Sequence, residues 1–289
     1  MNHIQYQDII EFTTLALESA GLDKFSIDAV TTGLCETSLR GIDSHGIRLL
    51  PHYINSAQSG RKNPCPAFKI TKKYPATGLL DADNAFGHSA GMKAIDECIK
   101  MASEYGVGIL GVSNSSHPGA MASFGLRAAR QGYISISMTH ADSLQKTHDG
   151  KRAYFGTNPI CFTAPRKDMD PYCLDMATSM ISWNKVLLAR ENNQTLDKNL
   201  AADENGVMTT DPNKARSLLS AGSYKGYGLA SMVEVLCGVF TGMTFGRDIP
   251  AMFTTPMDQA RKLGQFYLVM KTDSCVDNDS FLGNMLKMS

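Results

Sequence analysis

The order of segments around "GVGILG" (106–111) limits the folds open to this chain of 289 residues. These letters match the glycine pattern that holds a dinucleotide pyrophosphate. That pattern works only where a strand enters it and a helix leaves it, because the helix N-terminus supplies the amide donors. Here the order is reversed: "SAGMKAIDECIKMASEYG" has helical apolar spacing, and "VGILGVSNS" after it has the pattern of a buried strand. Gly106 is therefore predicted to cap a helix, and Gly108 and Gly111 to serve the turn into the strand.

The wider pattern predicts an α/β fold with one main sheet. From residue 66 to about residue 165, strand-like runs alternate with helical ones, which indicates an α/β or α+β domain. Residues 1–60 read as a helical layer and residues 61–289 as the sheet domain, joined by the polar link "SGRKNPCPAF". The expected strands are Lys69–Lys73, Gly78–Asp81, Gly108–Val112, Tyr133–Thr139 and Tyr154–Ala164, and the expected helices between them are His88–Tyr105 and Ala120–Gln131.

Charge and cysteine content exclude several classes of protein. Lys+Arg and Asp+Glu both number 28, so no net field favours nucleic acid or an acidic membrane surface. Seven cysteines without a C-x-x-C pair favour reduced thiols in a cytoplasmic protein over disulfides or a metal site. The N-terminus "MNHIQYQDII" lacks the pattern of a secretory signal. The apolar stretch 226–245 contains Glu234 and a helical stripe, which favours a packed core helix over a membrane span.

The densest cluster of chemically useful side chains is "RGIDSHGIRLLPHYI". It places Ser44, His45 and Arg48 close to flanking glycines, which let the backbone turn sharply and present these groups at an edge or cleft. Pro51 fits the first turn of a following helix. The alternative is that Asp43 and Ser44 only cap that helix and the charges are solvated. Position alone does not separate the two interpretations.

Four further stretches carry polar groups at predicted turns. His117 follows the strand that contains "GVGILG", and Thr157 and Asn158 lie between two apolar runs. Asp175 follows a short apolar run, and Lys225 precedes the long apolar helix, where a cation and free amides suit a phosphate or carboxylate. Each has a structural alternative: a polar loop, a turn former, a helix cap or an exposed lysine.

Together these stretches resemble one family, the type-2 malate/L-lactate dehydrogenases, which are NAD(P)-dependent 2-hydroxyacid oxidoreductases unrelated to Rossmann dehydrogenases. The matching motifs, in order, are "DSHG" followed by Arg48, "SNSSHPGA", "FGTNP", "LDMATS", "DENGVMTTDP" and "YKGYGLASMVEVLCG". The resemblance extends to about Leu268, nearly the whole chain. Within the family, "THAD", "FGTNP", "KGYGL" and the late "FGR" and "LGQ" are most similar to members that act on ureidoglycolate.

The resemblance implies a fold, a cofactor and partners. The family has an atypical, non-Rossmann mixed sheet that binds NAD or NADP and an N-terminal helical layer that joins in forming a homodimer. The implied substrate is a small 2-hydroxy or 2-oxo acid of malate, lactate or ureidoglycolate type. The implied cofactor-binding residues are His117, Pro118, Gly119, Ala120, Met121, Ala141, Asp175, Met176, Ala177, Tyr224 and Lys225.

The resemblance also implies catalytic roles. His45 is expected to donate or accept the proton, a task that suits imidazole because its pKa lies near working pH. Ser44 and Asp175 would orient it, Arg48 would clamp the substrate carboxylate, and Thr157 would add a substrate hydrogen bond. His117 matches a residue that contacts the cofactor and is assigned the proton transfer in the ureidoglycolate enzymes, so the two histidines compete for one role.

The sequence departs from the family pattern in two places. "QKTHDGKRAY" carries Asp149 where a glycine is usual, before "FGTNP". Relatives also continue for several dozen residues beyond "FLGNMLKMS", including a segment that closes over the cofactor. Two alternatives to the dehydrogenase therefore stay open: a non-catalytic or impaired, truncated relative that acts as a ligand-binding or oligomeric partner, and a cyclic-imine reductase on the same fold.

Overall fold

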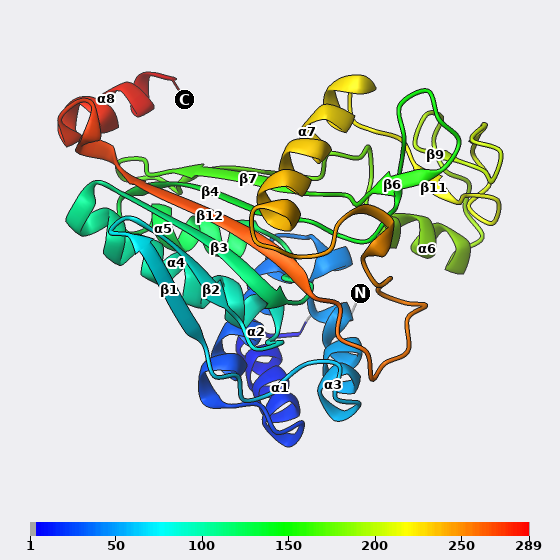
Figure 1. The fold of residues 1–289 in the computed structure, drawn as a ribbon, viewed down its shortest axis with the longest axis horizontal. Helices are drawn as coiled ribbons and strands as arrows, with labels where there is room; N and C mark the ends of the chain where they lie inside the picture. Colours follow the sequence, from blue (N-terminus) through cyan, green and yellow to red (C-terminus); the bar gives the residue numbers. More distant parts are fainter. Residues whose placement is uncertain (1–3, 289) are drawn as a thin grey trace.

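A seven-stranded mixed sheet forms the centre of the protein in a computed structural model, which describes residues 4–288 (Figure 1). Its strand order is β1-β2-β3-β12-β4-β7-β8. Only β2 and β3 are parallel, and every other neighbouring pair is antiparallel. The predicted mixed α/β class is therefore confirmed. The strands are β1 (Lys69–Tyr74), β2 (Thr77–Asp81), β3 (Val107–Ser115), β4 (Tyr133–Thr139), β7 (Ile160–Ala164), β8 (Tyr172–Met176) and β12 (Leu263–Lys271).

Strand β12 lies in the middle of this sheet although it comes from the far end of the chain. Phe266 pairs with Gly111 of β3 on one side and with Met138 of β4 on the other. Tyr267 and Val269 are completely buried, so β12 helps to form the central core. The sequence pattern did not predict this strand, because its place depends on partners that are distant in the sequence.

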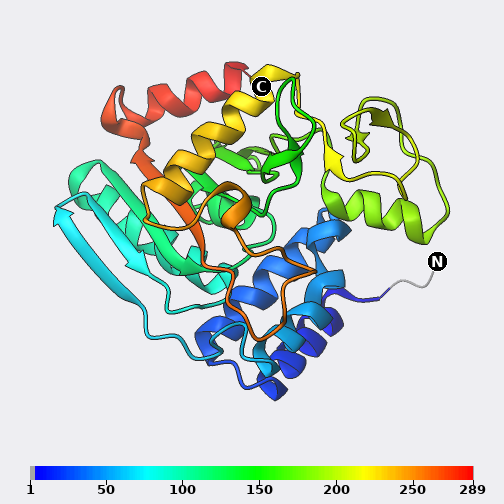
Figure 2. The same ribbon diagram turned by 45° about the vertical axis from the view of Figure 1, so that its right-hand side comes forward.

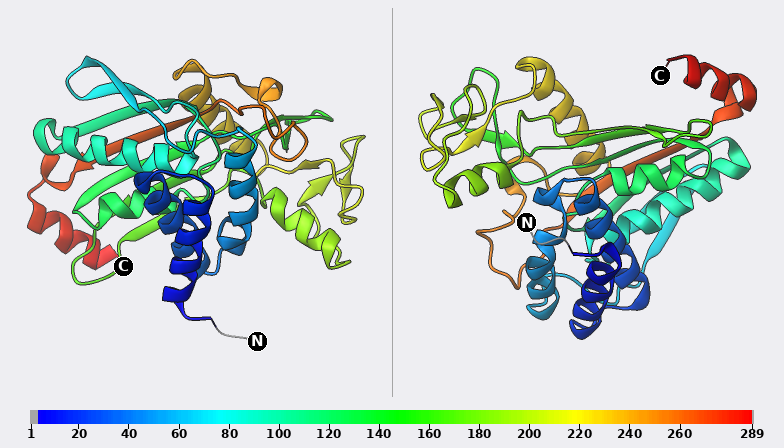
Figure 3. Two further views of the ribbon diagram at one scale, coloured as in Figure 1. Left: turned by 90° about the horizontal axis from the view of Figure 1, so that it is seen from below. Right: turned by 180° about the vertical axis from the view of Figure 1, so that it is seen from behind.

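Helices cover both faces of the sheet. The helices α4 (Gly87–Tyr105) and α5 (Ala122–Ala129) lie on one face, and α7 (Tyr224–Glu234) crosses the other (Figures 1 and 3). Gly106, with a φ of +81°, ends α4 in the left-handed region, as predicted. A Cβ on Gly108 would lie 2.2 Å from the Cys98 carbonyl oxygen, so glycine lets β3 approach α4 closely. Of the three glycines of "GVGILG", only Gly106 serves the helix-to-strand turn, whereas Gly108 and Gly111 lie within β3, so their predicted place in the turn is wrong.

The N-terminal segment forms the predicted helical layer below the sheet (Figure 2). The Asp23 carboxylate accepts a hydrogen bond from the Ser26 amide at 2.7 Å and so caps the second helix. Two 3₁₀ turns, Asp43–His45 and Ile47–Leu49, lead to the third helix, with Pro51 in its first turn as predicted. The helices are α1 (Tyr6–Ser19), α2 (Lys24–Leu39) and α3 (Leu50–Gln58).

This layer has its own apolar core but is not closed off from the rest. Its buried side chains pack with Phe86, which precedes α4, and with Met252, from the segment before β12. The domain boundary at residue 60 stays a prediction. The core side chains from the layer are Leu17, Leu22, Ile27, Val30, Leu34, Leu49, Leu50, Tyr53 and Ala57.

A second, five-stranded sheet with α6 (Trp183–Glu191) forms a small lobe at the opposite end of the molecule from α8 (Asn278–Met288) (Figures 1 and 3). The single strand predicted over 154–164 is wrong. It is two strands in different sheets, because Asn158, with a φ of +35°, and Pro159 break the run. The lobe contains β5 (Gln145–Lys146), β6 (Ala153–Phe155), β9 (Ala201–Ala202), β10 (Met208–Thr209) and β11 (Ser217–Leu218).

The long apolar stretch 226–245 is only partly a core helix. After α7 the chain makes one π-helical turn (Val235–Val239) and leaves the helix. Val233 is buried, as the predicted stripe requires, but Phe240 is 63% exposed, so the stripe does not continue into the core. Among residues 4–288, no helix has both the length and the apolar character needed to cross a bilayer. Short 3₁₀ turns follow at Gly246–Asp248 and Thr272–Ser274.

Candidate active site

The Asp-Ser-His turn and the loop after β3 meet at a cavity of about 250 Å³. His45 and His117 both line it, with ring centroids 5.6 Å apart and ring planes 26° from parallel. Thr157 and Ala141 line it too, so four predicted site residues come together. The other lining residues are Asp142, Ser143, Leu144, Ser182, Trp183, Asn184, Ala251, Met252, Phe253 and Thr254.

A hydroxyl group holds each imidazole at Nδ1. The Ser44 Oγ lies 2.9 Å from His45 Nδ1, as expected for an orienting residue, and the Tyr53 Oη lies 2.9 Å from His117 Nδ1. No residue within 4–288 forms a hydrogen bond to Nε2 of either ring. The Nε2 atoms are therefore the ring nitrogens available to a ligand.

Burial keeps both imidazoles neutral near pH 7. It lowers the pKa of His45 below its ordinary value. Burial also lowers the pKa of His117 well below 6.5, and the neighbouring His45 and the Arg261 and Lys62 cations lower it further. A neutral imidazole offers one donor and one acceptor, so each ring has the form that proton transfer or hydrogen bonding to an uncharged oxygen needs.

The cavity combines unsatisfied polar groups with apolar walls. The hydroxyls of Ser143 and Ser182 are buried and have no partner in the described part of the chain. Trp183, Met252 and Phe253 supply apolar surface beside them. A few placed polar groups among apolar and aromatic walls are typical of a small-ligand site.

Asp175 lies near the site but does not contact His45. Its carboxylate accepts a hydrogen bond from the Ala122 amide at 2.8 Å, at the start of α5, and burial raises its pKa. This bond fixes the end of β8, with Met176 and Ala177, against the loop that carries His117. The expected orienting contact from Asp175 to His45 is absent from the hydrogen bonds of residues 4–288, and its catalytic role stays a prediction.

Arg48 lies outside the cavity lining. Its Nη2 donates to both carboxylate oxygens of Glu191 at 2.7 and 2.8 Å, in a pair that is exposed to solvent. Asn184, from the same helix as Glu191, lines the cavity and donates to the Ser44 carbonyl oxygen at 2.7 Å. Arg48 is thus paired with a carboxylate of α6, the helix whose residues Trp183 and Asn184 line the cavity, and its role as a clamp for the substrate carboxylate stays a prediction.

Lys225 and Tyr224 are exposed in the first turn of α7 and do not line this cavity. The start of α7 nevertheless adjoins the cavity wall through Thr178. The Thr178 carbonyl oxygen accepts from the Ala221 amide at 2.9 Å, and the Thr178 amide donates to the Thr157 carbonyl oxygen at 2.9 Å. Thr178 therefore connects the start of α7 with Thr157, which lines the cavity, and the cofactor-binding roles of Tyr224 and Lys225 stay a prediction.

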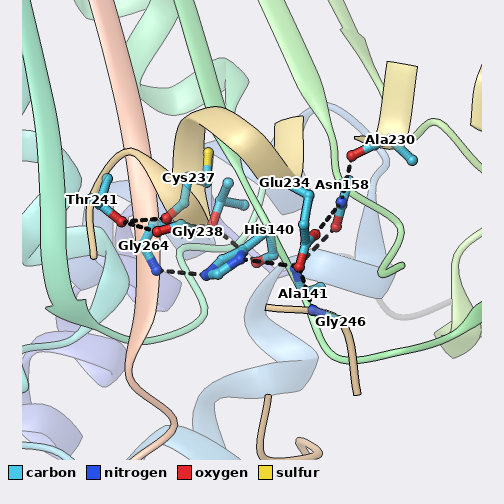
Figure 4. Close-up of polar contacts among 11 residues, drawn as sticks. His140, Ala141, Asn158, Ala230, Glu234, Cys237, Gly238, Thr241, Gly246 and Gly264 are labelled. Atoms are coloured by element: carbon cyan, nitrogen blue, oxygen red, sulfur yellow. Dashed lines mark hydrogen bonds and ion pairs between the residues drawn. The ribbon is translucent and has the colours of Figure 1, made fainter. Parts of the chain in front are cut away.

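A buried network behind the cavity was not predicted from the sequence (Figure 4). Asn158 Nδ2 donates to the Glu234 carboxylate at 2.7 Å, and Asn158 Oδ1 accepts from the Ala141 amide at 3.1 Å. The other Glu234 oxygen accepts from the Gly246 amide at 2.6 Å and lies 3.6 Å from His140 Nδ1. The network joins α7 to the two turns that place Thr157 and Ala141. The sequence feature that could have indicated this network is Glu234, a carboxylate inside an apolar helical run.

Two buried arginines hold the remaining wall, formed by the segment 250–256. Arg61 donates to the carbonyl oxygens of Met252, at 2.8 Å, of Thr255 and of Pro256. Arg261 pairs with the Asp142 carboxylate, which lines the cavity. The polar link "GRK" gave no sign that its arginine is completely buried.

These features define the class of protein. The chain has a mixed, non-Rossmann α/β fold, with a cavity that presents two neutral imidazoles beside unsatisfied hydroxyls. A model of the family described as malate/L-lactate dehydrogenase matches residues 4–289. The chain belongs to this family.

Two dehydrogenases and a reductase are among the known proteins that are similar to this chain. It is 37% identical over 262 residues to the ureidoglycolate dehydrogenase (NAD(+)) of Escherichia coli (strain K12), covering 91% of this chain and 75% of that protein. The structure of malate dehydrogenase from Entamoeba histolytica superposes with a TM-score of 0.93 at 28% identity, over 99% of this chain and 83% of that one. The structure of Δ1-piperideine-2-carboxylate reductase from Pseudomonas syringae pvar. tomato superposes with a TM-score of 0.91 at 27% identity, over 100% of this chain and 88% of that one.

Proposed function

We propose that this protein is an NAD(P)-dependent dehydrogenase that interconverts a small 2-hydroxy acid and its 2-oxo acid, with ureidoglycolate as the first candidate substrate. The observation that carries the proposal is the pair of neutral imidazoles, His45 and His117, facing one cavity. Family membership and the similarity to the ureidoglycolate enzyme support the class of reaction.

The residues around the cavity fit a nicotinamide cofactor. The loop 117–121 turns at Gly119, whose φ is +72° and where a Cβ would lie 2.6 Å from His88 Nε2. The free hydroxyls of Ser143 and Ser182 suit an amide or a hydroxy acid. The exposed Lys225 in the first turn of α7 suits a phosphate. When bound, the cofactor supplies or accepts the hydride. The residues that would hold it are His117, Pro118, Gly119, Ala120, Met121, Ala141, Asp175, Met176, Ala177, Tyr224 and Lys225.

Proton transfer at the substrate oxygen falls to His45. In oxidation, His45 Nε2 takes the proton of the substrate hydroxyl, and in reduction it returns that proton to the oxo oxygen. The Ser44 hydroxyl at Nδ1 stabilises the ring as it gains charge. Thr157 hydrogen-bonds the substrate, and the buried walls exclude water from the transfer.

The proposal is tested by offering NADH and NADPH in turn with pyruvate, oxaloacetate, an oxalurate-type oxo acid and a cyclic 2-imino acid. We expect consumption of at least one reduced cofactor with an oxo acid, fastest with the oxalurate type. Turnover of the imine alone would favour the reductase, which the similarity to the piperideine-carboxylate enzyme supports as the second candidate. Absence of both turnover and any change in NADH fluorescence would favour a non-catalytic relative.

Arg48 offers a separate expected result. Breaking its exposed pair with Glu191 frees the guanidinium to clamp a carboxylate, so Glu191→Gln is expected to lower the KM for the oxo acid, by about twofold to fivefold. Arg48→Gln is expected to raise that KM by roughly 10- to 100-fold, the range for a charge-assisted hydrogen bond. Steady-state kinetics measure both. An unchanged KM in Arg48→Gln would exclude the clamp.

We also propose a cytoplasmic homodimer. All seven cysteines are free thiols, which suits a reducing compartment. The helical layer exposes large apolar side chains, which favours its use as the interface between two copies. These are Ile4, Phe12, Leu15, Leu39 and Ile42.

A further inference from the structure

Tyr53 holds the second imidazole from inside the protein. It comes from α3 of the helical layer, is completely buried, and places its phenol oxygen 2.9 Å from His117 Nδ1. Its ring packs edge-on against Phe86 and His88, with centroid separations of 6.0 and 5.4 Å. Lys62 Nζ lies 3.9 Å from the ring centre on one face. The phenol is therefore fixed by contacts around its ring.

The surroundings of Tyr53 decide which partner donates. Among residues 4–288, His117 Nδ1 is the one hydrogen-bond partner of the phenol oxygen. Lys62 contacts the ring face, and both ring nitrogens of His88 are without partners, so neither accepts the phenol proton. If His117 Nδ1 donated instead, the buried phenol proton would have no acceptor, which folded proteins avoid. The phenol must then donate and the imidazole accept.

We propose that Tyr53 is a positioning residue that fixes His117 as the tautomer with its proton on Nε2. In this form His117 offers the cavity a permanent hydrogen-bond donor and cannot take up the proton of a substrate hydroxyl. His45 is not locked in this way, because the Ser44 hydroxyl is only half-buried and solvent can serve as its second partner. The two histidines therefore divide the work: His45 transfers the proton and His117 donates a hydrogen bond.

The catalytic meaning of this assignment rests on the proposed function, but the tautomer itself does not. The decisive measurement is a long-range ¹H–¹⁵N correlation spectrum of the full chain with labelled histidine, near neutral pH and without ligand. The His117 signals are assigned by their loss in His117→Gln. We expect an unprotonated Nδ1 and a protonated Nε2. A protonated Nδ1 would overturn the proposal whether or not the protein turns over any substrate.

Tyr53→Phe removes only the phenol oxygen and gives a second test. We expect mixed tautomer signals for His117 and a fall in kcat of about tenfold, with the KM for the oxo acid within about twofold of wild type. Wild-type kcat together with an unchanged tautomer would contradict the role of Tyr53. If this variant does not fold, the wild-type spectrum still decides.

Tyr267→Phe is the matched control. Tyr267 is equally buried and its hydroxyl donates to Gln265 Oε1 at 2.7 Å, in the sheet and not at the cavity. Both variants lose one buried phenol hydrogen bond, so a general loss of stability would affect both. A change of tautomer and kcat is expected in Tyr53→Phe alone. If the wild-type protein has His117 protonated on Nε2 but turns over none of the substrates, this inference stands and the proposed function is contradicted.

Discussion

Replacing His45 with glutamine is expected to lower kcat by about 10²–10⁴-fold, the usual contribution of a general acid–base residue. Glutamine keeps a polar group of similar reach but cannot exchange a proton near neutral pH. The KM for the oxo acid should change little, since Thr157 and Arg48 are expected to provide the binding. Consumption of reduced cofactor at saturating substrate measures the loss, and quenching of NADH fluorescence checks that the cofactor still binds.

His117→Gln is the matched variant on the other side of the cavity, 5.6 Å from the first ring. It retains a donor in its amide group, so we expect kcat to fall by no more than about tenfold to a hundredfold, with weaker NADH binding. The comparison separates the two histidines. If His117→Gln abolished turnover while His45→Gln kept most of it, the assignment of the proton to His45 would be wrong.

Adjacent buried cations give the largest expected effects on stability, in opposite directions. Arg61 and Lys62 are both almost wholly inaccessible to solvent. Arg61 donates to three carbonyl oxygens of the wall segment, of Met252, Thr255 and Pro256. Arg61→Met leaves these acceptors unpaired and is expected to lower the free energy of unfolding by about 3–5 kcal/mol. The same change should raise the KM for the oxo acid, because the wall loses its anchor.

Lys62→Met is expected to raise the free energy of unfolding by about 1–3 kcal/mol near neutral pH. The Lys62 ammonium has no hydrogen-bond partner within residues 4–288 and lies against the Tyr53 and Phe86 rings. Burial, together with the nearby Arg261 and Arg61 cations, lowers its pKa well below the ordinary value. Methionine has a similar length and needs no partner, so it fits the same space without the cost of desolvation.

The lysine also sets a pH dependence with a definite sign. In the unfolded chain Lys62 is protonated up to about pH 10.4, whereas in the folded protein burial and the neighbouring arginines lower its pKa, so the ammonium form is disfavoured there. At pH values between the folded and the unfolded pKa, folding releases a proton, and the cost of folding with Lys62 grows as the pH falls through this range. The advantage of Lys62→Met should therefore be larger at about pH 6 than at about pH 9, measured by denaturant unfolding. A variant less stable than wild type at both values would mean that the cation stabilises through the aromatic rings.

The order of the sequence motifs predicted which residues line the site, but it did not predict which side chains contact one another there. "DSHG" and "SNSSHPGA" were expected to share a site, and His45 and His117 line one cavity. Arg48, from the same turn, pairs instead with Glu191, a residue that lies far along the chain and that no local pattern links to it. A side chain with several rotatable bonds takes the nearest opposite charge, and which charge is near depends on the packing of α6.

Local conformation explains another difference. The strand predicted over 154–164 had the right composition on both sides of its centre. Asn158 breaks it, since its backbone is in the left-handed region and its side chain bonds to Ala141 and Glu234. That conformation is stabilised by partners from the loop after β4 and from α7, so single-sequence periodicity could not reveal it.

The sequence by itself determined what depends on neighbours in the chain: the Gly106 cap, the helical layer, the alternating strands and the reversed order that excludes a Rossmann loop. It also carried the motifs of the family. Only the tertiary structure decided that β12 enters the middle of the sheet, that Tyr53 reaches His117, and that Arg61 anchors a distant wall. Local propensity acts over one or two helical turns, whereas these contacts form because burial makes each polar group find a partner wherever the folded chain supplies one.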